Sequence, residues 1–188
     1  RLMSENKCTI CSSPSFGYDL AAKRIAGDAI TLDLSHWRAA GIGGDMVRAD
    51  VLKRFAEALS VAGFNAKAFL PSYGMAEATL AVSISDVDAP IKIDTVDLSA
   101  LKTKQRAIPA KKASEGLTRS FVVCGPALPD HEMEVRAEDG SVLDERMVGR
   151  IFVRGPSLMT GYFNAPEATA QTIGTDGFLD TGDMGYLL

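Results

Sequence analysis

The feature that most constrains the fold is an amphipathic helix followed closely by a short strand and a tight turn. Apolar side chains recur at helical spacing from Val47 to Ala62, and Gly63 can end the helix. We interpret Lys67 to Leu70 as a short strand that Pro71 interrupts, and Met75 to Ser83 as a second helix. This succession indicates an α/β arrangement. The apolar face of the first helix consists of Val51, Leu52, Phe55, Leu59 and Ala62.

After about Ser85 the sequence changes to short β-like runs separated by Gly, Pro and Asp turns. Asp139-Gly140 has the composition of a hairpin turn, which requires positive φ. The stretch from Lys102 to Lys112 is basic and poor in apolar residues, so we expect an exposed loop. The second half is therefore predicted to be mostly β. Its expected strands are Val87–Ile93, Phe121–Cys124, Glu132–Arg136 and Arg150–Arg154.

Composition and charge restrict the class of partner. The 188 residues carry a net charge of −4, which argues against nucleic acid or an anionic membrane and favours a small ligand. No apolar run approaches the roughly 18 to 20 residues that span a bilayer, and the start lacks the apolar core of a signal peptide. Three cysteines do not suggest a disulfide framework, so we expect a cytoplasmic protein. We interpret Cys8 and Cys11 as buried thiols in preference to a zinc or redox site.

The loop from Ser72 to Glu77 is the first candidate binding site. It joins an expected strand to an expected helix, where open α/β sheets bind ligands and where backbone N–H groups attract anions. Tyr73 offers a flat ring for a purine, Gly74 permits close backbone approach, and the Glu77 carboxylate can bind hydrated Mg²⁺. Alone, the loop is not specific, because a Glu in a first helical turn often only compensates the helix dipole.

Asp183 is the second candidate. It lies in the segment Thr181-Gly182-Asp183, which we expect to form a turn. An ionised carboxylate has two oxygens that can accept both hydroxyls of a ribose. The competing interpretation is an Asp that caps its own turn, which is the commoner use.

The order of such segments is more specific than any one of them. It closely resembles the central to late motifs of the adenylate-forming superfamily, which includes acyl-CoA synthetases, luciferases, nonribosomal-peptide adenylation domains and fatty acyl-AMP ligases. The matching segments are Gly43-Gly44-Asp45, Pro71 to Thr79, Gly149 to Pro156, Gly161-Tyr162-Phe163 and Thr181-Gly182-Asp183.

Several segments resemble the fatty acyl-AMP ligase branch in particular. Ser15 to Leu20 is similar to its S-F-A-Y-D-L sequence, and Ser35 to Arg38 to its S-x-W-R sequence. Tyr73 to Ser83 is similar to its Y-G-L-A-E-A-T-L-A-V-S sequence. The segment from about Ser85 to Ser120 is long at the place where this branch carries an insertion.

The resemblance implies a fold and a division of the chain. Residues 1–85 would form part of an α/β subdomain with the nucleotide-binding loop. Residues 86–188 would form a mostly β subdomain, a distorted β-barrel that includes the insertion and the ribose-binding turn.

The resemblance also implies roles for the site residues. Tyr73 would stack on adenine, Asp183 would bind the ribose hydroxyls, and Glu77 would be the catalytic residue that holds Mg²⁺ and phosphate. Phe16 and Tyr18, together with Met75, would line the acyl or adenylate side, although Phe16 and Met75 could equally be core. The other nucleotide-binding positions would be Gly43, Gly44, Ser72, Gly74, Met75 and Ala76.

Asp45 departs from the family pattern. The segment Ile42 to Met46 stands where the family usually has N-G-A-E-P, so we interpret Asp45 as the cap of the helix that follows it. Trp37 is interpreted as a core residue, and His36 and His131 as structural.

The implied activity belongs to a longer parent enzyme. Such an enzyme would use ATP and Mg²⁺ to activate a fatty acid as acyl-AMP, and would pass it to the phosphopantetheine thiol of an acyl carrier protein. The phosphate loop and the lysine-bearing C-terminal domain of the family are not found here, so we expect this polypeptide alone to be inactive. A fatty acyl-CoA synthetase and a non-catalytic nucleotide-binding module are the alternatives. The resemblance also suggests that the segment from Ser85 to Ser120 restrains transfer to CoA.

Overall fold

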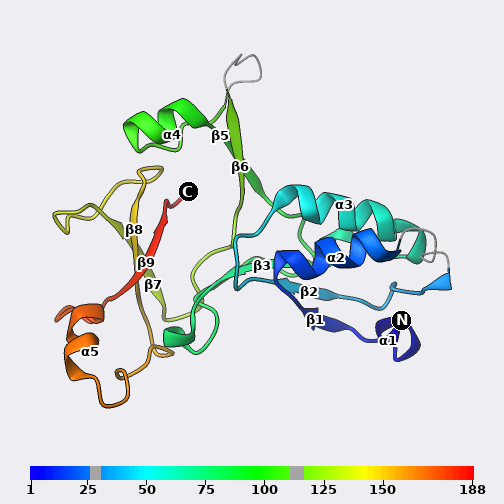
Figure 1. Ribbon diagram of the computed structural model, residues 1–188, viewed down its shortest axis with the longest axis horizontal. Coiled ribbons are helices and arrows are strands. Elements are labelled where there is room, and N and C mark those ends of the chain that lie inside the picture. Colours follow the sequence, from blue (N-terminus) through cyan, green and yellow to red (C-terminus); the bar gives the residue numbers. More distant parts are fainter. Residues whose placement is uncertain (26–30, 111–116) are drawn as a thin grey trace. The chain divides into compact units, whose positions relative to one another are not determined.

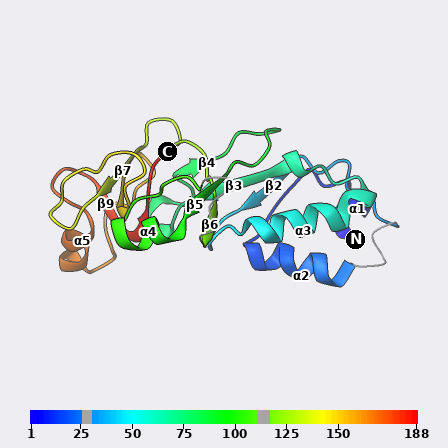
Figure 2. The ribbon, with the colours of Figure 1, turned by 90° about the horizontal axis from the view of Figure 1, so that it is seen from above.

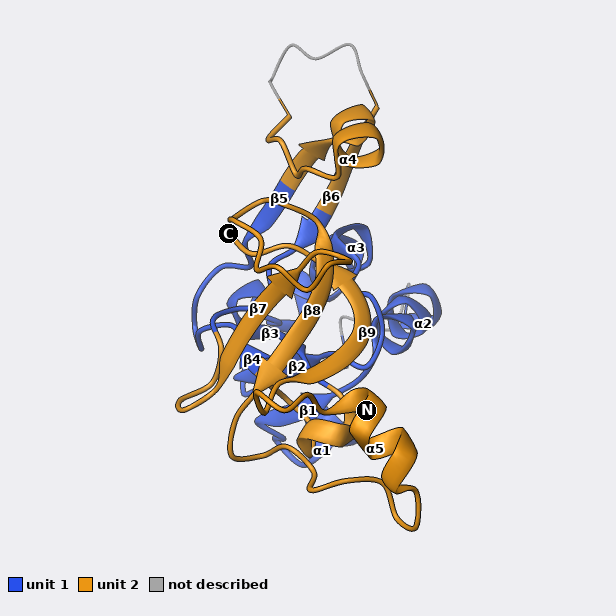
Figure 3. Cartoon of the chain, turned by 90° about the vertical axis from the view of Figure 1, so that its left-hand side faces the viewer, with its two compact units in different colours: residues 1–74, 83–94, 121–126 blue, residues 75–82, 95–120, 127–188 orange. Residues whose placement is uncertain are grey.

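The computed structural model describes residues 1–25, 31–110 and 117–188, traced in Figure 1. The chain divides into two units that interleave along the sequence and do not separate at residue 85 (Figure 3). Unit 1 comprises residues 1–74, 83–94 and 121–126, and unit 2 comprises residues 75–82, 95–120 and 127–188. No helix in the described ranges is long and apolar enough to cross a membrane.

Unit 1 is built on a four-stranded sheet of order β1-β2-β3-β4. The first three strands are parallel, and β4 is antiparallel to β3. The α/β arrangement expected from the sequence is thereby confirmed. The elements are α1 (Leu2–Glu5), β1 (Ile10–Ser12), α2 (Ser15–Ile25), β2 (Ala39–Ile42), α3 (Ala49–Leu59), β3 (Phe69–Tyr73) and β4 (Ser83–Ile84).

Helices α2 and α3 cover the same face of this sheet and pack against each other (Figure 2). The chirality of parallel connections explains the arrangement. The crossovers β1–α2–β2 and β2–α3–β3 both step in the same direction along the sheet, and right-handed crossovers that step in one direction place their helices on one face. Because β2 and β3 are parallel, their carboxyl ends lie at the same edge of the sheet.

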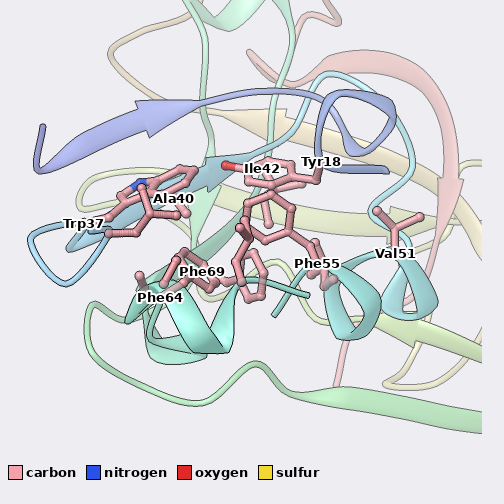
Figure 4. Packing of buried hydrophobic residues seen from close by; sticks show 13 residues of the cluster. Tyr18, Trp37, Ala40, Ile42, Val51, Phe55, Phe64 and Phe69 are labelled. Carbon is pink, nitrogen blue, oxygen red and sulfur yellow. The ribbon is translucent and has the colours of Figure 1, made fainter. Parts of the chain in front are cut away.

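The predicted amphipathic helix is confirmed as α3, continued by a 3₁₀ turn at Ser60–Ala62 and ended by Gly63 with φ of +79°. Its apolar face is buried against the sheet, with Phe55 at the centre of an aromatic cluster (Figure 4). The Phe55 ring lies edge-on to its neighbours at centroid distances of 5.0 Å to Tyr18 and 5.1 Å to Phe64. Trp37 belongs to this core, as the sequence predicted.

Pro71 does not interrupt β3, contrary to expectation. The strand runs through it, and its carbonyl accepts bonds from the backbone N–H and the Oγ of Ser85. In a strand, the nitrogen and the carbonyl oxygen of one residue point to the same side. The position where Pro71 lacks an N–H therefore faces β4, and the pairing of β3 with β4 ends next to Pro71. The proline therefore removes only one hydrogen bond, at the end of the short β3–β4 pairing.

The helix predicted from Met75 to Ser83 is absent from the structure. Only a 3₁₀ turn forms, at Ala76–Ala78, and Thr79 follows with φ of +67°. Ser83 and Ile84 then pair with the end of β3. A chain that must turn back along β3 within these few residues cannot continue as a helix, so strand pairing overrides the local helical propensity.

Unit 2 contains a three-stranded antiparallel sheet of order β7-β8-β9, and a two-stranded sheet is formed by β5 and β6. The mostly β second half is thus confirmed. Gly140, with φ of +85°, occupies the predicted hairpin turn, since Arg136 and Val142 bridge across it. The remaining elements of the described chain are β5 (Ile93–Asp97), α4 (Leu98–Lys104), β6 (Thr118–Val122), β7 (Glu132–Arg136), β8 (Gly149–Arg154), α5 (Pro166–Thr172) and β9 (Leu179–Gly185), and β5 and β6 have residues in both units.

The described residues 85–110 and 117–120 differ from the expected strand and loop, because they include the helix α4 between β5 and β6. The run from Val87 is not a strand until Ile93, and Lys102 and Lys104 lie in the last turn of α4. The side chain of Asp97 accepts a 2.8 Å bond from the Ala100 N–H, which caps this helix and is a local signal the sequence analysis missed. The end of the expected loop, with Lys111 and Lys112, lies outside the described residues.

Replacing Phe55 by Ala should destabilise the protein by about 3 to 5 kcal/mol, because it removes the ring at the centre of the aromatic cluster and leaves a cavity. Urea unfolding followed by tryptophan fluorescence measures the change, since Trp37 lies in the same cluster. Val61→Ala is the control, because Val61 is 66% exposed. Equal losses for the two variants would contradict the central role of Phe55.

Candidate functional site

The turn after β2 meets the end of β3 at the carboxyl edge of the parallel sheet. The Oγ of Ser72 donates a 3.1 Å bond to the carbonyl of Ile42. A Cβ added at Gly43 would stand 2.8 Å from that Oγ and 3.2 Å from the Ser72 carbonyl, so a side chain at Gly43 cannot be accommodated without a shift. Gly44 adopts φ of +78° and faces open space. Sequence reasoning singled out these residues, and the fold brings Gly43 and Ser72 together.

Tyr73 and Gly74 continue this edge. Tyr73 is the last residue of β3, pairs with Ser83 of β4 and is partly exposed. Gly74 is the last residue of unit 1, and Met75 begins unit 2. A backbone edge with glycines at its turns and a half-exposed aromatic ring suits a flat, polar ligand at the carboxyl ends of parallel strands.

In unit 2, Glu77 lies in the 3₁₀ turn Ala76–Ala78 and is partly exposed, whereas Ala76 is exposed. The hydroxyl of Tyr162 donates a 2.8 Å hydrogen bond to Oε1 of Glu77. This bond to the carboxylate is the main cause that raises the pKa of the Tyr162 phenol above its ordinary value. In the sequence Tyr162 is recognisable only as part of the Gly161-Tyr162-Phe163 motif, because 85 residues separate it from Glu77.

Asp183 does not lie in a simple turn, as the sequence suggested, but within strand β9. Residues 181–183 stand opposite Ile151 of β8, at a bulge in the β8–β9 ladder. The Thr181 hydroxyl donates to the Ile151 carbonyl, and Gly182 adopts φ of +74°. The Asp183 side chain is exposed. Bulges re-aim side chains, which makes this position suited to presenting a carboxylate.

Phe16 and Tyr18 have different environments although both belong to α2. Phe16 is 69% exposed, which leaves its ring available to a ligand. Tyr18 is only 2% exposed, and its hydroxyl donates a 3.0 Å bond to the Gly41 carbonyl in β2. Burial raises the pKa of this phenol. The expectation that Tyr18 lines the acyl side is therefore corrected: its ring is in the core, where it supports the strand that leads to Gly43.

Asp45 is a helix cap, but of a different helix from the one expected. Its Oδ1 accepts a 3.0 Å bond from the backbone N–H of Ser15, the first residue of α2, while α3 has Arg48 at its N-cap without a side-chain bond. Ser15 is buried and donates its hydroxyl to the Met46 carbonyl. The cap thus joins two segments that sequence inspection treated as separate.

His131, interpreted as structural, has two partners in unit 2. Its Nδ1 lies 2.9 Å from the Pro129 carbonyl and its Nε2 lies 2.7 Å from Oγ of Ser157. Gly155 is tight against the imidazole, since an added Cβ would come within 2.3 Å of a ring carbon. This ring therefore supports the chain around Ser157.

The carboxylates of the described part of the chain do not form a self-contained metal site, because it holds no group of three or more His, Cys, Asp or Glu suited to a cation. Glu77 offers one carboxylate, with Oε1 bonded to a neutral phenol. Mg²⁺ is commonly held by one or two carboxylates together with substrate phosphates and water. Glu77 fits a cation that arrives with a nucleotide.

The chain is similar to known proteins of one family. Residues 1–163 match the AMP-binding enzyme family. A Caulobacter vibrioides protein, provisionally named an acyl-CoA synthetase, is 52% identical over 98% of this chain and 32% of its own length. The medium-chain fatty acid–[acyl-carrier-protein] ligase JamA of Moorena producens is 32% identical over 98% of this chain and 33% of its own length. The chain thus spans about a third of these relatives.

Solved structures give the same result. A fatty acyl-adenylate ligase from a study of the E. coli and L. pneumophila enzymes superposes with a TM-score of 0.93 at 42% identity, over 100% of this chain and 34% of its own. An L. pneumophila ligase in complex with acyl adenylate and pyrophosphate gives a TM-score of 0.89 at 31% identity, over 99% of this chain and 33% of its own. The chain belongs to the AMP-binding enzyme family of adenylate-forming ligases. Its resemblance to the fatty acyl-AMP ligases is confirmed by these neighbours.

Asp45→Ala should destabilise the protein by about 0.5 to 2 kcal/mol, because it removes the acceptor at the start of α2. Asp45→Asn keeps an acceptor oxygen and should cost less. Chemical unfolding of the full-length protein measures both, and ATP affinity is measured in parallel. An Asp45→Ala variant of unchanged stability but weakened ATP binding would show that Asp45 contacts the ligand and is not a structural cap.

Proposed function

We propose that the full-length protein activates a fatty acid with ATP, forming an acyl adenylate and pyrophosphate. The observation that carries the proposal is the contact at the carboxyl edge of the parallel sheet, where Gly43, just after β2, is tight against Ser72 near the end of β3 and Tyr73-Gly74 follows. It is supported by membership of the AMP-binding family and by structural neighbours that include a ligase with bound acyl adenylate. A cytoplasmic location is proposed with it, because all three cysteines are free.

The nucleotide-binding roles are assigned residue by residue, from the motifs that resemble the family. In unit 1, the Tyr73 ring is assigned to stack on adenine, and Gly43, Gly44, Ser72 and Gly74 are assigned to line adenine and ribose. Among the residues of unit 2, Met75 and Ala76 are assigned to the nucleotide and Asp183 to the ribose hydroxyls. The exposed ring of Phe16 is assigned to the acyl side.

The reaction is an in-line displacement at the α-phosphorus. A carboxylate oxygen of the fatty acid forms a bond to phosphorus, the bond to the bridging oxygen of the β-phosphate breaks, and pyrophosphate leaves with the electron pair. Glu77 is assigned to hold Mg²⁺, which supplies charge neutralisation for the phosphates when it is bound. The backbone turns and Tyr73 contribute by positioning, which converts binding into an oriented reaction.

The acyl group then passes to an external thiol: its sulfur bonds to the acyl carbon, the bond from that carbon to the phosphate oxygen breaks, AMP leaves, and the thiol proton goes to solvent. We assign this thiol to the phosphopantetheine arm of an acyl carrier protein. Two relatives named as [acyl-carrier-protein] ligases support this acceptor. Cys124 is unsuited to act as acceptor, because burial raises the pKa of its thiol to about 11 and leaves little thiolate at neutral pH. Free CoA is the second candidate, favoured by the provisional name of the 52% identical relative.

The test is pyrophosphate release by the full-length protein with ATP, Mg²⁺ and fatty acids of graded length, followed by addition of either holo-carrier protein or CoA. We expect fatty-acid-dependent release and thioester on the carrier. Thioester formation on CoA at a similar rate would instead identify an acyl-CoA synthetase. No release with any acid would refute adenylation and leave a nucleotide-binding module.

Asp183→Asn should raise the KM for ATP by about tenfold, because an amide keeps one acceptor oxygen and loses the charge that strengthens the contact with the ribose. Steady-state pyrophosphate release measures it. Asp130→Asn is the matched control, since Asp130 is exposed in the same unit at φ of +61°, a conformation that Asn tolerates. Equal KM values for the two variants would leave Asp183 a structural residue of the bulge.

A further inference from the structure

Three hydrogen bonds fasten the chain between Ser157 and Tyr162 to the turn that carries Glu77. The Met159 N–H donates to the Glu77 carbonyl at 2.7 Å, and the Thr79 hydroxyl donates to the Ser157 carbonyl at 3.0 Å. The third is the 2.8 Å bond from the Tyr162 hydroxyl to Oε1 of Glu77. All these residues belong to unit 2, so the contact is internal to one unit. The backbone and the side chain of Glu77 are therefore both held from the same loop.

The turn after Glu77 is strained. Thr79 adopts φ of +67°, a conformation that is unfavourable for a β-branched residue and persists only where the surroundings enforce it. Two contacts hold this conformation: the Leu80 N–H donates a 2.8 Å bond across Thr79 to the Ala78 carbonyl, and the Thr79 hydroxyl donates to the Ser157 carbonyl. Strain of this kind concentrates at functional sites, which distinguishes this turn from an ordinary surface connection.

Tyr162 is itself fixed by the chain around α5. Its backbone N–H donates 2.9 Å to Oγ1 of Thr169, which in turn donates 2.9 Å to the Ala165 carbonyl. Gly161, at φ of +155°, approaches so closely that an added Cβ would lie 2.8 Å from a methyl carbon of Thr169. The hydroxyl is consequently presented from an anchored backbone, and the contact with Glu77 is not a chance approach of two mobile side chains.

The chemistry of the pair favours a function beyond packing. A phenol is a neutral donor, so it orients the carboxylate without cancelling its charge, as the ammonium of a lysine or the guanidinium of an arginine would. In the described part of the chain Oε1 has this one side-chain partner, and no other side chain bonds to the Glu77 carboxylate. The second carboxylate oxygen of Glu77 is thus left for a cation.

We propose that Tyr162 is a positioning residue whose hydroxyl holds the Glu77 carboxylate in the orientation that receives a nucleotide-bound divalent cation. The inference rests on the proposed function, since it deepens the role assigned to Glu77. Orientation before binding removes the loss of side-chain freedom that an unrestrained glutamate would incur when it meets the cation.

The experiment uses the full-length protein with Tyr162→Phe, which removes one oxygen and keeps the ring. Binding of Mn²⁺–ATP is followed by electron paramagnetic resonance, and the Mg²⁺ dependence of pyrophosphate release is measured alongside. We expect Mn²⁺–ATP to bind about threefold to tenfold more weakly, within the range for one hydrogen bond to a partly exposed charged group. Activity should recover at high Mg²⁺, because the cation then compensates for the disordered carboxylate.

Two further variants separate positioning from structure. Phe163→Leu changes the adjacent aromatic residue without removing a polar atom and should leave Mn²⁺–ATP affinity unchanged. Tyr162→Phe should have no added effect on that affinity in a Glu77→Gln background, since the two residues then act as one unit. Melting temperatures of all variants report any loss of fold.

The outcomes are distinct. The positioning role would be overturned if the Tyr162→Phe variant kept wild-type Mn²⁺–ATP affinity and wild-type Mg²⁺ dependence, whatever its melting temperature. The proposed function would still stand. An equal loss in the Glu77→Gln background would also overturn it, because the hydroxyl would then act independently of Glu77. A wild-type protein that neither binds Mn²⁺–ATP nor releases pyrophosphate would overturn the proposed function and the inference together.

Discussion

The packing of Phe55 against the aromatic residues beneath the parallel sheet is the interaction on which unit 1 depends. The surrounding rings are those of Tyr18 in α2, Trp37 before β2, Phe64 before β3 and Phe69 in β3. Because these side chains interlock at the density of a protein interior, the strands they flank cannot slide. The Tyr18 hydroxyl extends this constraint to the backbone, through its bond to the Gly41 carbonyl.

A fixed register of β2 and β3 has a direct consequence at the sheet edge. Ile42 pairs with Pro71, so the next residues, Gly43 and Ser72, are forced into contact. The absence of a side chain at Gly43 is therefore a requirement of the packing behind it. Because Gly43 and Ser72 are so close, this edge of the sheet is lined by backbone atoms. Such an edge suits a ligand that is recognised through its flat ring and its hydroxyls.

Unit 2 uses different interactions to hold its site. The guanidinium of Arg136 lies over the rings of Phe152 and Phe178, at 4.5 and 4.7 Å from their centroids, and Arg154 lies 4.4 Å from the Phe178 centroid. Cation–π contacts of this kind fix β8 next to the start of β9. The bulge at residues 181–183 interrupts the regular pairing of this sheet, and Asp183 lies in the bulge.

The sequence by itself determined the elements whose signals are local. The period of apolar residues specified α3, Gly63 specified its end, and the Asp139-Gly140 pair specified a hairpin turn. The order of short motifs was sufficient to indicate the superfamily and its branch. These signals are readable because each depends on residues within a few positions of one another.

Tertiary structure decided what depends on partners distant in the chain. Pairing with β3 explains why a 3₁₀ turn and a short strand form where a helix was expected after Met75. Pro71 fits in β3 because the pairing of β3 with β4 ends next to it. Burial moved Tyr18 from the candidate site into the core. The cap from Asp45 to α2 spans 30 residues and the bond from Tyr162 to Glu77 spans 85. No local propensity encodes such contacts, because they exist only after folding brings the segments together.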